Sequence, residues 1–442
     1  MKKLEEKLNG SKKLNIIVTS VVLVIAAIIT IITGIEYRSF SKYDVYFFKG
    51  NVTETQKLSQ YSPNIKDTVG DCDVYIIKGP EVVEGKEKDC PSILLLGGTH
   101  PNEPAGQLAS VTILENLVVK GNTIVYIITE ANKSAYTHSH PQEASPFYYD
   151  LTTKSGKVRT FKFGSRATNT NEQWPNPDIY THPSGQQLST NEVRNLNRAY
   201  PGKIDGTYTE QVAYGITELI RQNDIKITID FHEASPEYNN INSIVYHQKA
   251  SSLAVDAQFE FELAISDQTI TLNPSPENFR GLTHRELGDH TDTFAFLCET
   301  SNAAQGKIRG DFTEDLITYY KEDKFYEKAW SITEAANKGD ESAIKLLYAP
   351  AATIDVRVAR HVSTALSVVV AYNMGIDNPN KSFASCNEAR RNHLVSCGKF
   401  DFELNLDGDY IGLDNSGNGL YIDTLYELLT ENKVGYYLHD PE

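Results

Sequence analysis

The chain has 442 residues, with 42 Lys and Arg against 58 Asp and Glu and a formal net charge of −16. This acidic balance argues against a nucleic acid partner, because proteins that bind a phosphate backbone concentrate Lys and Arg on one surface. The length allows one large hydrophobic core with a smaller satellite, so neither a disulfide nor a metal is needed to compensate for small size.

The N-terminal region contains an uncharged run, IIVTSVVLVIAAIITIITGI, that begins at Ile16 and ends at Ile35. It has the roughly 20 residues that a bilayer-spanning helix needs. Five lysines precede it, so the positive-inside rule predicts a cytoplasmic tail at residues 1–13, a transmembrane anchor in the lipid bilayer at residues 14–35, and an extracytoplasmic body. A cleaved signal peptide is the alternative, but its apolar part would be unusually long and no small-residue cleavage site follows.

The remainder divides into three expected parts. Residues 36–89 read as a stalk and leading strands, with weak strand patterns in YDVYFFKG and CDVYIIKG. Residues 90–339 alternate short β-branched runs with amphipathic ones, which predicts an α/β domain with a mixed, mostly parallel sheet flanked by helices. Residues 340–442 read as a helical and mixed region, whose charges exclude a second membrane span.

Five cysteines are compatible with an extracytoplasmic body. Cys72 and Cys90 are close in sequence, as are Cys386 and Cys397, so two local disulfides are one interpretation. Scattered buried thiols are the other, because connectivity cannot be deduced from spacing alone.

The first motif that carries chemistry is SILLLGGTHPNEPAG. We expect the strand to end near Gly97 and Pro104 to occupy the first turn of the following helix. His100 and Glu103 then project from the carboxyl end of the strand and the start of the helix, close enough to share one ion. Imidazole and carboxylate groups are standard zinc ligands, but a catalytic site needs a third protein ligand.

Two further apolar strands lead to residues of the same kind. IKITIDFHEASPEYN runs into His232, and TFAFLCETSN reaches Glu299. Ligands of open parallel sheets bind beyond the carboxyl ends of the strands, so these side chains are expected at the same edge as His100 and Glu103. A fourth segment, EVRNLNRAYPG, brings Arg194 and Arg198 together with two asparagines. Arg can bind a substrate carboxylate bidentately, although a solvated loop would have the same composition.

These four motifs occur in the order found in the zinc carboxypeptidase superfamily, and the GGTHPNEPAG context resembles its succinylglutamate desuccinylase/aspartoacylase branch. The resemblance covers about residues 90–310. It implies one zinc ion per chain, with general-base and general-acid roles for one residue and carboxylate anchoring by two others. The implied metal ligands are His100, Glu103 and His232, the implied base is Glu299, and the implied anchors are Asn197 and Arg198.

Two positions depart from that branch. Pro101 stands where Gly is usual, and Asn195 replaces the Asp of the usual Asp-Leu-Asn-Arg. Such an Asp orients a ligand His through a hydrogen bond, so its replacement predicts weaker support for the metal. An Arg beside the scissile carbonyl would stabilise the oxyanion, and both Arg194 and Arg166, in KFGSRATN, are candidates.

The sequence therefore predicts a membrane-anchored zinc hydrolase that cleaves an amide bond next to a carboxylate. An N-acyl amino acid deacylase is the first interpretation, acting on a small acyl-amino acid or peptide substrate. An extracytoplasmic carboxypeptidase acting on peptides or cell-wall peptides is the main alternative, because the anchor would place the site near such polymers. An inactive substrate-binding module is the alternative of a different class.

Overall fold

The computed structural model describes residues 2–42, 45–138, 148–302, 304–306, 314–318, 334–335, 338–344, 352–406, 409–412 and 422–441. The chain forms two compact units, Met1–Asp44 and Val45–Glu442. The second unit includes segments from all three parts expected beyond the N-terminal helix.

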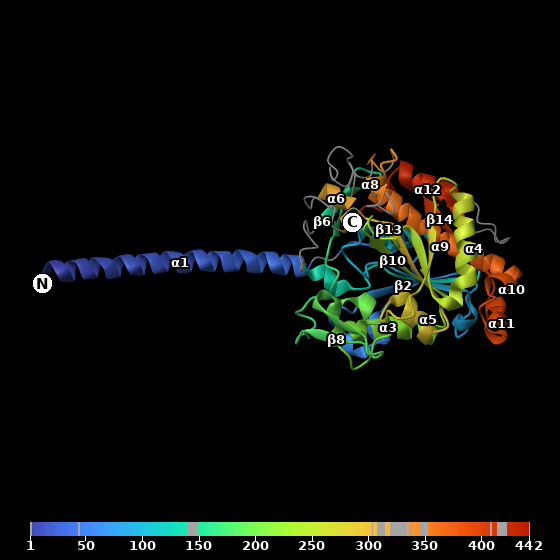
Figure 1. Cartoon of the computed structure of the whole chain (residues 1–442), viewed down its shortest axis with the longest axis horizontal. Coiled ribbons are helices and arrows are strands. Elements are labelled where there is room, and N and C mark those ends of the chain that lie inside the picture. Colours follow the sequence, from blue (N-terminus) through green and yellow to red (C-terminus); the bar gives the residue numbers. More distant parts are fainter. Residues whose placement is uncertain are drawn as a thin grey trace. The chain divides into compact units, whose positions relative to one another are not determined.

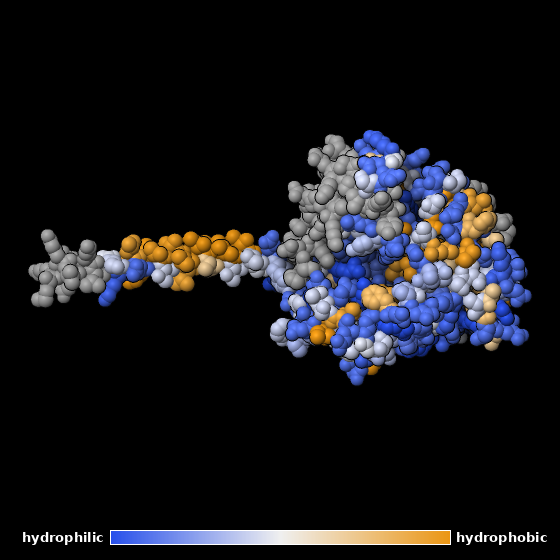
Figure 2. Space-filling model, viewed as in Figure 1, coloured by the Kyte–Doolittle hydropathy of each residue, from blue (hydrophilic) through white to orange (hydrophobic). Residues whose placement is uncertain are grey.

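The first unit consists of α1, Lys2–Lys42. Within it, Gly10–Arg38 has a mean hydropathy of 2.9 over its most apolar window, and no part of that window is buried. Figure 2 shows the apolar residues along this helix. The helix is long and apolar enough to cross a membrane, and a signal sequence near the N-terminus would have the same properties.

The second unit is built around an eight-stranded sheet in the order β1-β2-β5-β3-β10-β13-β11-β12. The strands are β1 Glu54–Lys57, β2 Asp73–Lys78, β5 Ile124–Ile128, β3 Ser92–Leu96, β10 Ile227–Ala234, β13 Phe294–Ser301, β11 Ser243–Tyr246 and β12 Thr271–Pro274. The central strands β5, β3, β10 and β13 are mutually parallel, whereas β1, β2 and β11 each pair antiparallel with a neighbour. The predicted mixed, mostly parallel sheet is thus confirmed, with β1 and β2 extending one edge.

Helices cover both faces of this sheet (Figure 1). Alternate side chains of β3 separate the two sides, as expected for a pleated strand. Leu94 and Leu96 pack in a core with α3, Tyr208–Asn223, and α5, Thr283–His290. Ile93 and Leu95 instead border a small apolar cavity lined by α2, Pro104–Asn116, and α9, Ile354–Asp377.

The C-terminal region belongs to the second of these layers. α9 packs against α2, β13 and α4, Ser251–Ala264. Further helices are α6 Glu314–Thr318, α8 Glu341–Ile344, α10 Pro379–Ser382, α11 Glu388–Cys397 and α12 Ile422–Glu431. Three small sheets complete the described elements: β15 Asp409–Gly412 with β14 Phe402–Leu406 and β4 Leu117–Val119, β6 Tyr148–Thr152 with β7 Val158–Lys162, and β8 Ile179–Thr181 with β9 Gln187–Ser189. Pairing of β4 with β14 joins residues 117–119 to the C-terminal region.

α2 lies unusually close to β10. Every residue of α2 is buried, and a Cβ atom added at Gly106 would stand 2.4 Å from the carbonyl oxygen of Phe231. Only glycine therefore permits this approach. Because Glu103 immediately precedes α2 and His232 follows Phe231, the close packing brings these two side chains together.

Each of the five cysteines is a free thiol, so neither of the two local disulfides considered from the sequence is formed. Cys72 and Cys90 belong to the same hydrophobic core without being bonded, and Cys90 Sγ is directed at the carbonyl oxygen of Lys86 at 3.6 Å. Cys397 Sγ contacts the carbonyl oxygen of Lys88 at 3.8 Å. Proximity in sequence therefore did not place either pair of sulfur atoms together.

Candidate metal centre and active site

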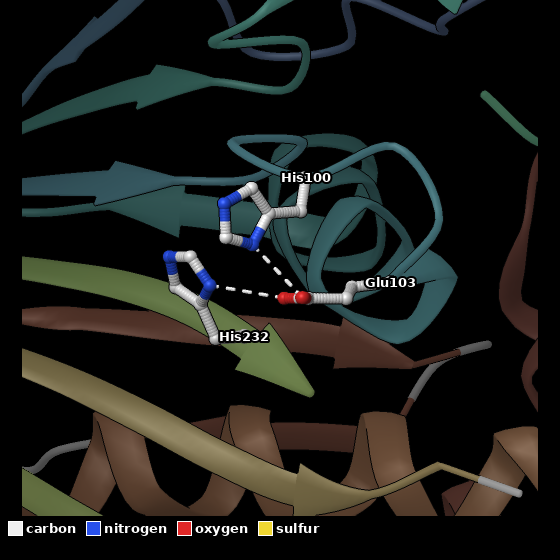
Figure 3. A group of neighbouring side chains, drawn as sticks. All are labelled: His100, Glu103 and His232. Carbon is white, nitrogen blue, oxygen red and sulfur yellow. Dashed lines mark hydrogen bonds and ion pairs between the residues drawn. The ribbon is translucent and has the colours of Figure 1, made fainter. Parts of the chain in front are cut away.

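His100, Glu103 and His232 converge at the carboxyl ends of β3 and β10 (Figure 3). One ligand atom from each residue lies within 4.8 Å of the others, and all three side chains are buried. The two carboxylate oxygens of Glu103 face the two rings, with Oε1 2.8 Å from His100 Nδ1 and Oε2 2.9 Å from His232 Nδ1. The structure thus brings together the three side chains that the strand pattern predicts as metal ligands.

The turn that carries His100 and Glu103 keeps the pair together despite Pro101. β3 ends at Leu96 and α2 begins at Pro104, close to the expected boundaries. The Glu103 amide donates to the His100 carbonyl at 2.9 Å, which closes the turn across Pro101. Proline at this position is therefore compatible with the convergence of the two side chains.

The outer nitrogen of each ring faces an oxygen acceptor. His100 Nε2 lies 2.8 Å from Asn195 Oδ1, and His232 Nε2 lies 2.9 Å from Asp230 Oδ2. Asp230 is fixed in turn by the hydroxyl of Thr283, which donates to Oδ2 at 2.6 Å. If each Nε2 carries the hydrogen, both Nδ1 lone pairs point inward, which is the arrangement of metal-ligating histidines. The residues present therefore fit a zinc ion.

Electrostatics around the three donors also favour a cation. Burial opposes the protonation of His232, but the carboxylates of Asp230 and Glu103 outweigh it and raise the pKa of the ring well above its ordinary value. Burial alone would raise the pKa of Glu103, but the two imidazoles together have the larger effect and lower it well below its ordinary value. For His100, burial is the dominant effect and lowers the pKa. Glu103 is therefore ionised between the two rings.

Glu299 lies beside His232 on the neighbouring strand. The parallel pairing of β10 with β13 sets the two residues in register, so their side chains share one face of the sheet. Burial, opposed by His232 and reinforced by Glu103, raises the pKa of Glu299 to about 8. Its Oε2 atom is buried without a hydrogen-bond partner among the described residues. A carboxyl group of this kind can exchange a proton near neutral pH.

The two candidate arginines occupy different surroundings. Arg166 Nη1 lies 3.4 Å from Glu103 Oε1, so this guanidinium reaches the metal donors. Arg194 is buried and donates to the carbonyl oxygen of Thr168. Of the two arginines, Arg166 is therefore the one whose guanidinium contacts a candidate metal ligand.

Asn197 and Arg198 lie next to the donors in the 3-10 helix Leu196–Arg198. The Asn197 side-chain oxygen accepts from the Thr283 amide at 2.8 Å, and it lies 2.9 Å from the Thr283 hydroxyl, whose hydrogen goes to Asp230. The Arg198 guanidinium stacks 4.6 Å from the Phe279 ring centre and pairs through Nε with Glu192 at 2.8 Å. Burial lowers the pKa of Arg198 to about 10, so the side chain remains cationic at neutral pH.

A buried ion pair lies directly behind the donors. Glu233 follows His232, and its carboxylate pairs with Arg357 of α9, with both side chains essentially inaccessible. The Glu233 amide donates to Glu103 Oε2 at 3.0 Å, and its carboxylate accepts from the amide of Ala105 at 2.9 Å. The C-terminal region therefore contributes a side chain that fixes the backbone around the metal donors.

Sequence reasoning assigned no role to Asp230, Glu192 or Arg357. Asp230 had a signal, because it precedes His232 by two residues on a strand and must share its face. Glu192 had a weaker one, since it lies in the same short segment as Arg194 and Arg198. Arg357 had none, because it is 124 residues from Glu233.

Comparison with known proteins gives matches in structure alone. No protein-family model matches the chain, and no curated protein matches it. Among solved structures, a succinylglutamate desuccinylase/aspartoacylase from Rhodobacter sphaeroides is 16% identical, with a TM-score of 0.33, over 61% of this chain and 63% of that chain. The product-bound cell shape determinant protein Csd4 from Helicobacter pylori is 11% identical, with a TM-score of 0.38, over 67% and 54%.

A metallo-carboxypeptidase from Burkholderia cenocepacia is similar at 10% identity and a TM-score of 0.35, over 57% of this chain and 56% of that chain. The structural neighbours thus include a succinylglutamate desuccinylase/aspartoacylase and a metallo-carboxypeptidase. The chain spans 54 to 63% of the length of the three neighbours. Because a fold can host many activities, the function is argued from the residues of the site.

Proposed function

We propose that the protein is a zinc-dependent hydrolase that cleaves an amide bond next to a carboxylate, and that its substrate is an N-acyl amino acid. The observation that carries the proposal is the convergence of His100, Glu103 and His232 within 4.8 Å, with Glu299 in register beside His232. Three protein ligands with a carboxylate alongside are the composition of a catalytic zinc site, in which the remaining position takes water or substrate.

The side chains around the donors supply acid-base chemistry. A zinc ion held by His100, Glu103 and His232 would lower the pKa of a bound water and polarise a carbonyl group. Glu299, whose pKa is raised by burial, takes a proton from the attacking water and returns it to the departing amine. Because Glu299 ends the cycle in the state in which it began, no further proton carrier is required.

Arg166, Arg198 and Asn197 divide the remaining tasks. The Arg166 guanidinium, 3.4 Å from Glu103, is placed to stabilise negative charge that develops on the carbonyl oxygen. The Arg198 guanidinium and the Asn197 amide anchor the substrate carboxylate and so hold the amide bond in place. Arg198 is suited to this task because its side chain is held on the Phe279 ring and is only 12% exposed.

A carboxypeptidase acting on peptides or cell-wall peptides is the second candidate. The apolar Gly10–Arg38 stretch of α1 supports it, since a retained anchor would hold the enzyme near such polymers. In this proposal α1 is a single-pass anchor, residues 1–13 are cytoplasmic, and the hydrolase unit is extracytoplasmic. Protease treatment of intact cells would then digest the unit from Val45 onward, whereas full protection would contradict this orientation.

Zinc content and turnover test the central proposal. The full-length chain, purified in detergent, should hold about one zinc ion, as one three-ligand site requires. His232→Ala should lose the zinc, whereas His290→Ala, a change at a histidine that is 44% exposed, should retain it. Glu299→Gln should keep the zinc and lose hydrolysis. Full zinc occupancy in His232→Ala would reject the ligand assignment, and undiminished turnover in Glu299→Gln would reject the base.

Substrate preference separates the two candidate activities. The same preparation should be assayed with a panel of N-acyl amino acids and with peptides and muropeptides that end in a free carboxylate. Preferred hydrolysis of the acyl-amino acids would support the deacylase. Preferred release of a terminal amino acid from peptides would favour the carboxypeptidase.

A further inference from the structure

We propose that Glu192 is a positioning residue that joins the metal ligand His100 to the arginines of the substrate site. Asn195 has no carboxylate to offer His100, and Glu192, which binds the Asn195 side chain, supplies one at the next position in the hydrogen-bond chain. The inference rests on the proposed function and adds a link between the metal ligands and the residues that bind the substrate carboxylate. Four side chains carry it in sequence: His100, Asn195, Glu192 and the pair Arg166 and Arg198.

The first link is the Asn195 amide. Its Oδ1 atom lies 2.8 Å from His100 Nε2 and also accepts from the Asn197 amide at 2.9 Å, whereas its Nδ2 donates to Glu192 Oε2 at 3.1 Å. With the oxygen and nitrogen exchanged, Nδ2 would face the Asn197 N–H and Oδ1 would face a carboxylate. The network therefore fixes the orientation of the amide and makes it a bridge between the imidazole and Glu192.

The second link is the Glu192 carboxylate, which lies between two guanidinium groups. Oε2 lies 2.8 Å from Arg198 Nε, and Oε1 lies 3.4 Å from Arg166 Nε. Both contacts use the Nε edge of the guanidinium, so the terminal nitrogens are directed elsewhere. Arg166 Nη1 points at Glu103 and Arg198 Nη1 donates to the Asn197 carbonyl at 2.7 Å. Glu192 thus pairs by charge with both cations, while a terminal nitrogen of each guanidinium contacts a different group.

The charges agree with a positioning role. Burial would raise the pKa of Glu192, but Arg198 and Arg166 outweigh burial and lower it, so the side chain is ionised. Arg166 also faces Glu103, so Glu192 is the carboxylate that the two guanidinium groups share. A carboxylate that accepts from an amide N–H also polarises that amide, which strengthens the hydrogen bond from His100 to the amide oxygen. In this arrangement the occupancy of the substrate site and the affinity for zinc are coupled.

Charge removal at Glu192 is the direct test. In the full-length protein, Glu192→Gln should weaken zinc binding about tenfold in a chelator competition, the lower end of the effect of outer-shell changes at metal sites. It should also raise the KM for a carboxylate substrate about tenfold while leaving the KM for its carboxamide analogue nearly unchanged. Glu192→Asp should recover most of both effects. Glu172→Gln, the same change at a partly buried position in a neighbouring loop, is the matched control.

A second variant tests the bridge itself. Asn195→Asp places a carboxylate directly against His100 but sets it opposite Glu192, and the two carboxylates repel each other. Glu192→Gln should therefore tighten zinc binding in the Asn195→Asp background, although it weakens zinc binding in the wild-type background. This reversal of sign in a double-mutant cycle is specific to direct coupling between the two side chains.

The outcomes separate this inference from the proposed function. Wild-type protein without zinc would overturn the metal site itself. Wild-type zinc binding and hydrolysis together with unchanged zinc affinity and unchanged KM in Glu192→Gln would overturn only the role of Glu192. A fall in the KM of Glu192→Gln for the carboxylate substrate would also overturn it, because Glu192 would then be a competitor of the substrate. Equal losses on the carboxylate and carboxamide substrates would show a general structural effect and reject the positioning role.

Discussion

The two ends of α2 carry buried glutamates with different partners. Glu103 immediately precedes the helix and faces the rings of His100 and His232. Glu115 lies in the last turn and binds Arg159 Nη1 through both oxygens, at 2.7 and 2.8 Å. The relative exposures are 2% and 4%, so burial does not distinguish the two residues.

The partners distinguish them. Glu115 accepts from a permanently charged guanidinium and from two backbone amides, those of Phe48 and His439. None of these donors can release its proton near neutral pH. The carboxylate therefore holds the segments of Phe48, Arg159 and His439 against α2 by hydrogen bonds that do not change with pH in this range. The imidazoles that face Glu103 can instead present lone pairs to a cation. Glu103 also accepts from the Glu233 amide and lies near Arg166, so the feature that separates it from Glu115 is the pair of imidazoles that faces it.

The largest effect is expected at the Glu103 end. Glu103→Gln removes a ligand charge, and we expect the zinc to be lost and turnover to fall by about 1,000-fold or more, equivalent to about 4 kcal/mol in the activation free energy. Zinc content and kcat/KM of the full-length protein measure both. Retained zinc with normal kcat/KM in Glu103→Gln would show that Glu103, like Glu115, has only a structural role.

The next effect is expected at the Glu115 end. Arg159→Met leaves Glu115 buried without its cation and should reduce the free energy of unfolding by about 3 kcal/mol, as broken buried ion pairs do. Zinc content should not change. Chemical denaturation gives the stability, and the double variant Arg159→Met, Glu115→Leu should regain much of the loss, because an apolar pair leaves no unpaired charge. Loss of zinc in Arg159→Met would show that the two ends are not independent.

A smaller effect is expected at the substrate anchor. Arg198→Ala should raise the KM for a carboxylate substrate about 30-fold, or about 2 kcal/mol, with a smaller change in kcat. Steady-state kinetics provide the measurement. Arg221→Ala is the control, since this guanidinium is 49% exposed and contacts Glu218 and the carbonyl oxygen of His290 rather than the candidate site. Equal KM values in both variants would remove Arg198 from the anchor role.

The smallest effect concerns Asp224, a structural carboxylate that lies at neither end of α2. Burial raises its pKa, but Lys226, Arg390 and His393 outweigh burial and lower it. A lowered folded-state pKa stabilises the fold above the ordinary value of 3.8 and loses this contribution as the pH falls. Asp224→Asn should therefore cost about 1 kcal/mol at pH 7, because the Asp224 side chain is 25% exposed and the buried Lys226 keeps the carbonyl oxygens of Lys88 and residue 224 as acceptors. The difference from wild type should shrink toward pH 3 in denaturation experiments, and a constant difference would contradict an electrostatic origin.

Much of the fold and the donor set could be predicted because they depend on local patterns. Apolar runs that end in His100, His232 and Glu299 mark strands, and parallel strands bring their carboxyl ends to one edge. The structure places these residues in β10, in β13 and just after β3, although β10 and β13 continue two residues beyond His232 and Glu299. The positions at which apolar runs end were therefore enough to predict that these residues lie close together, though not to predict the exact ends of the strands.

The surrounding network could not be predicted in the same way. The contacts of Glu192 depend on the side-chain conformations of Arg166 and Arg198 in loops that have no periodic pattern. The Glu233–Arg357 pair depends on how α9 packs, and the two residues are 124 positions apart. Hydrogen-bond partners over such separations follow from tertiary packing rather than from sequence spacing.

The close contact between Gly106 and Phe231 helps to set the separation of Glu103 and His232 in the candidate metal site. The span between the Glu103 and His232 donors is governed by how far two pieces of main chain stand apart, and a single added carbon at Gly106 would overlap the Phe231 carbonyl oxygen at 2.4 Å. The separation of the Glu103 and His232 side chains thus depends on a residue that offers no side-chain atom of its own, because a larger residue at position 106 would push α2 away from β10.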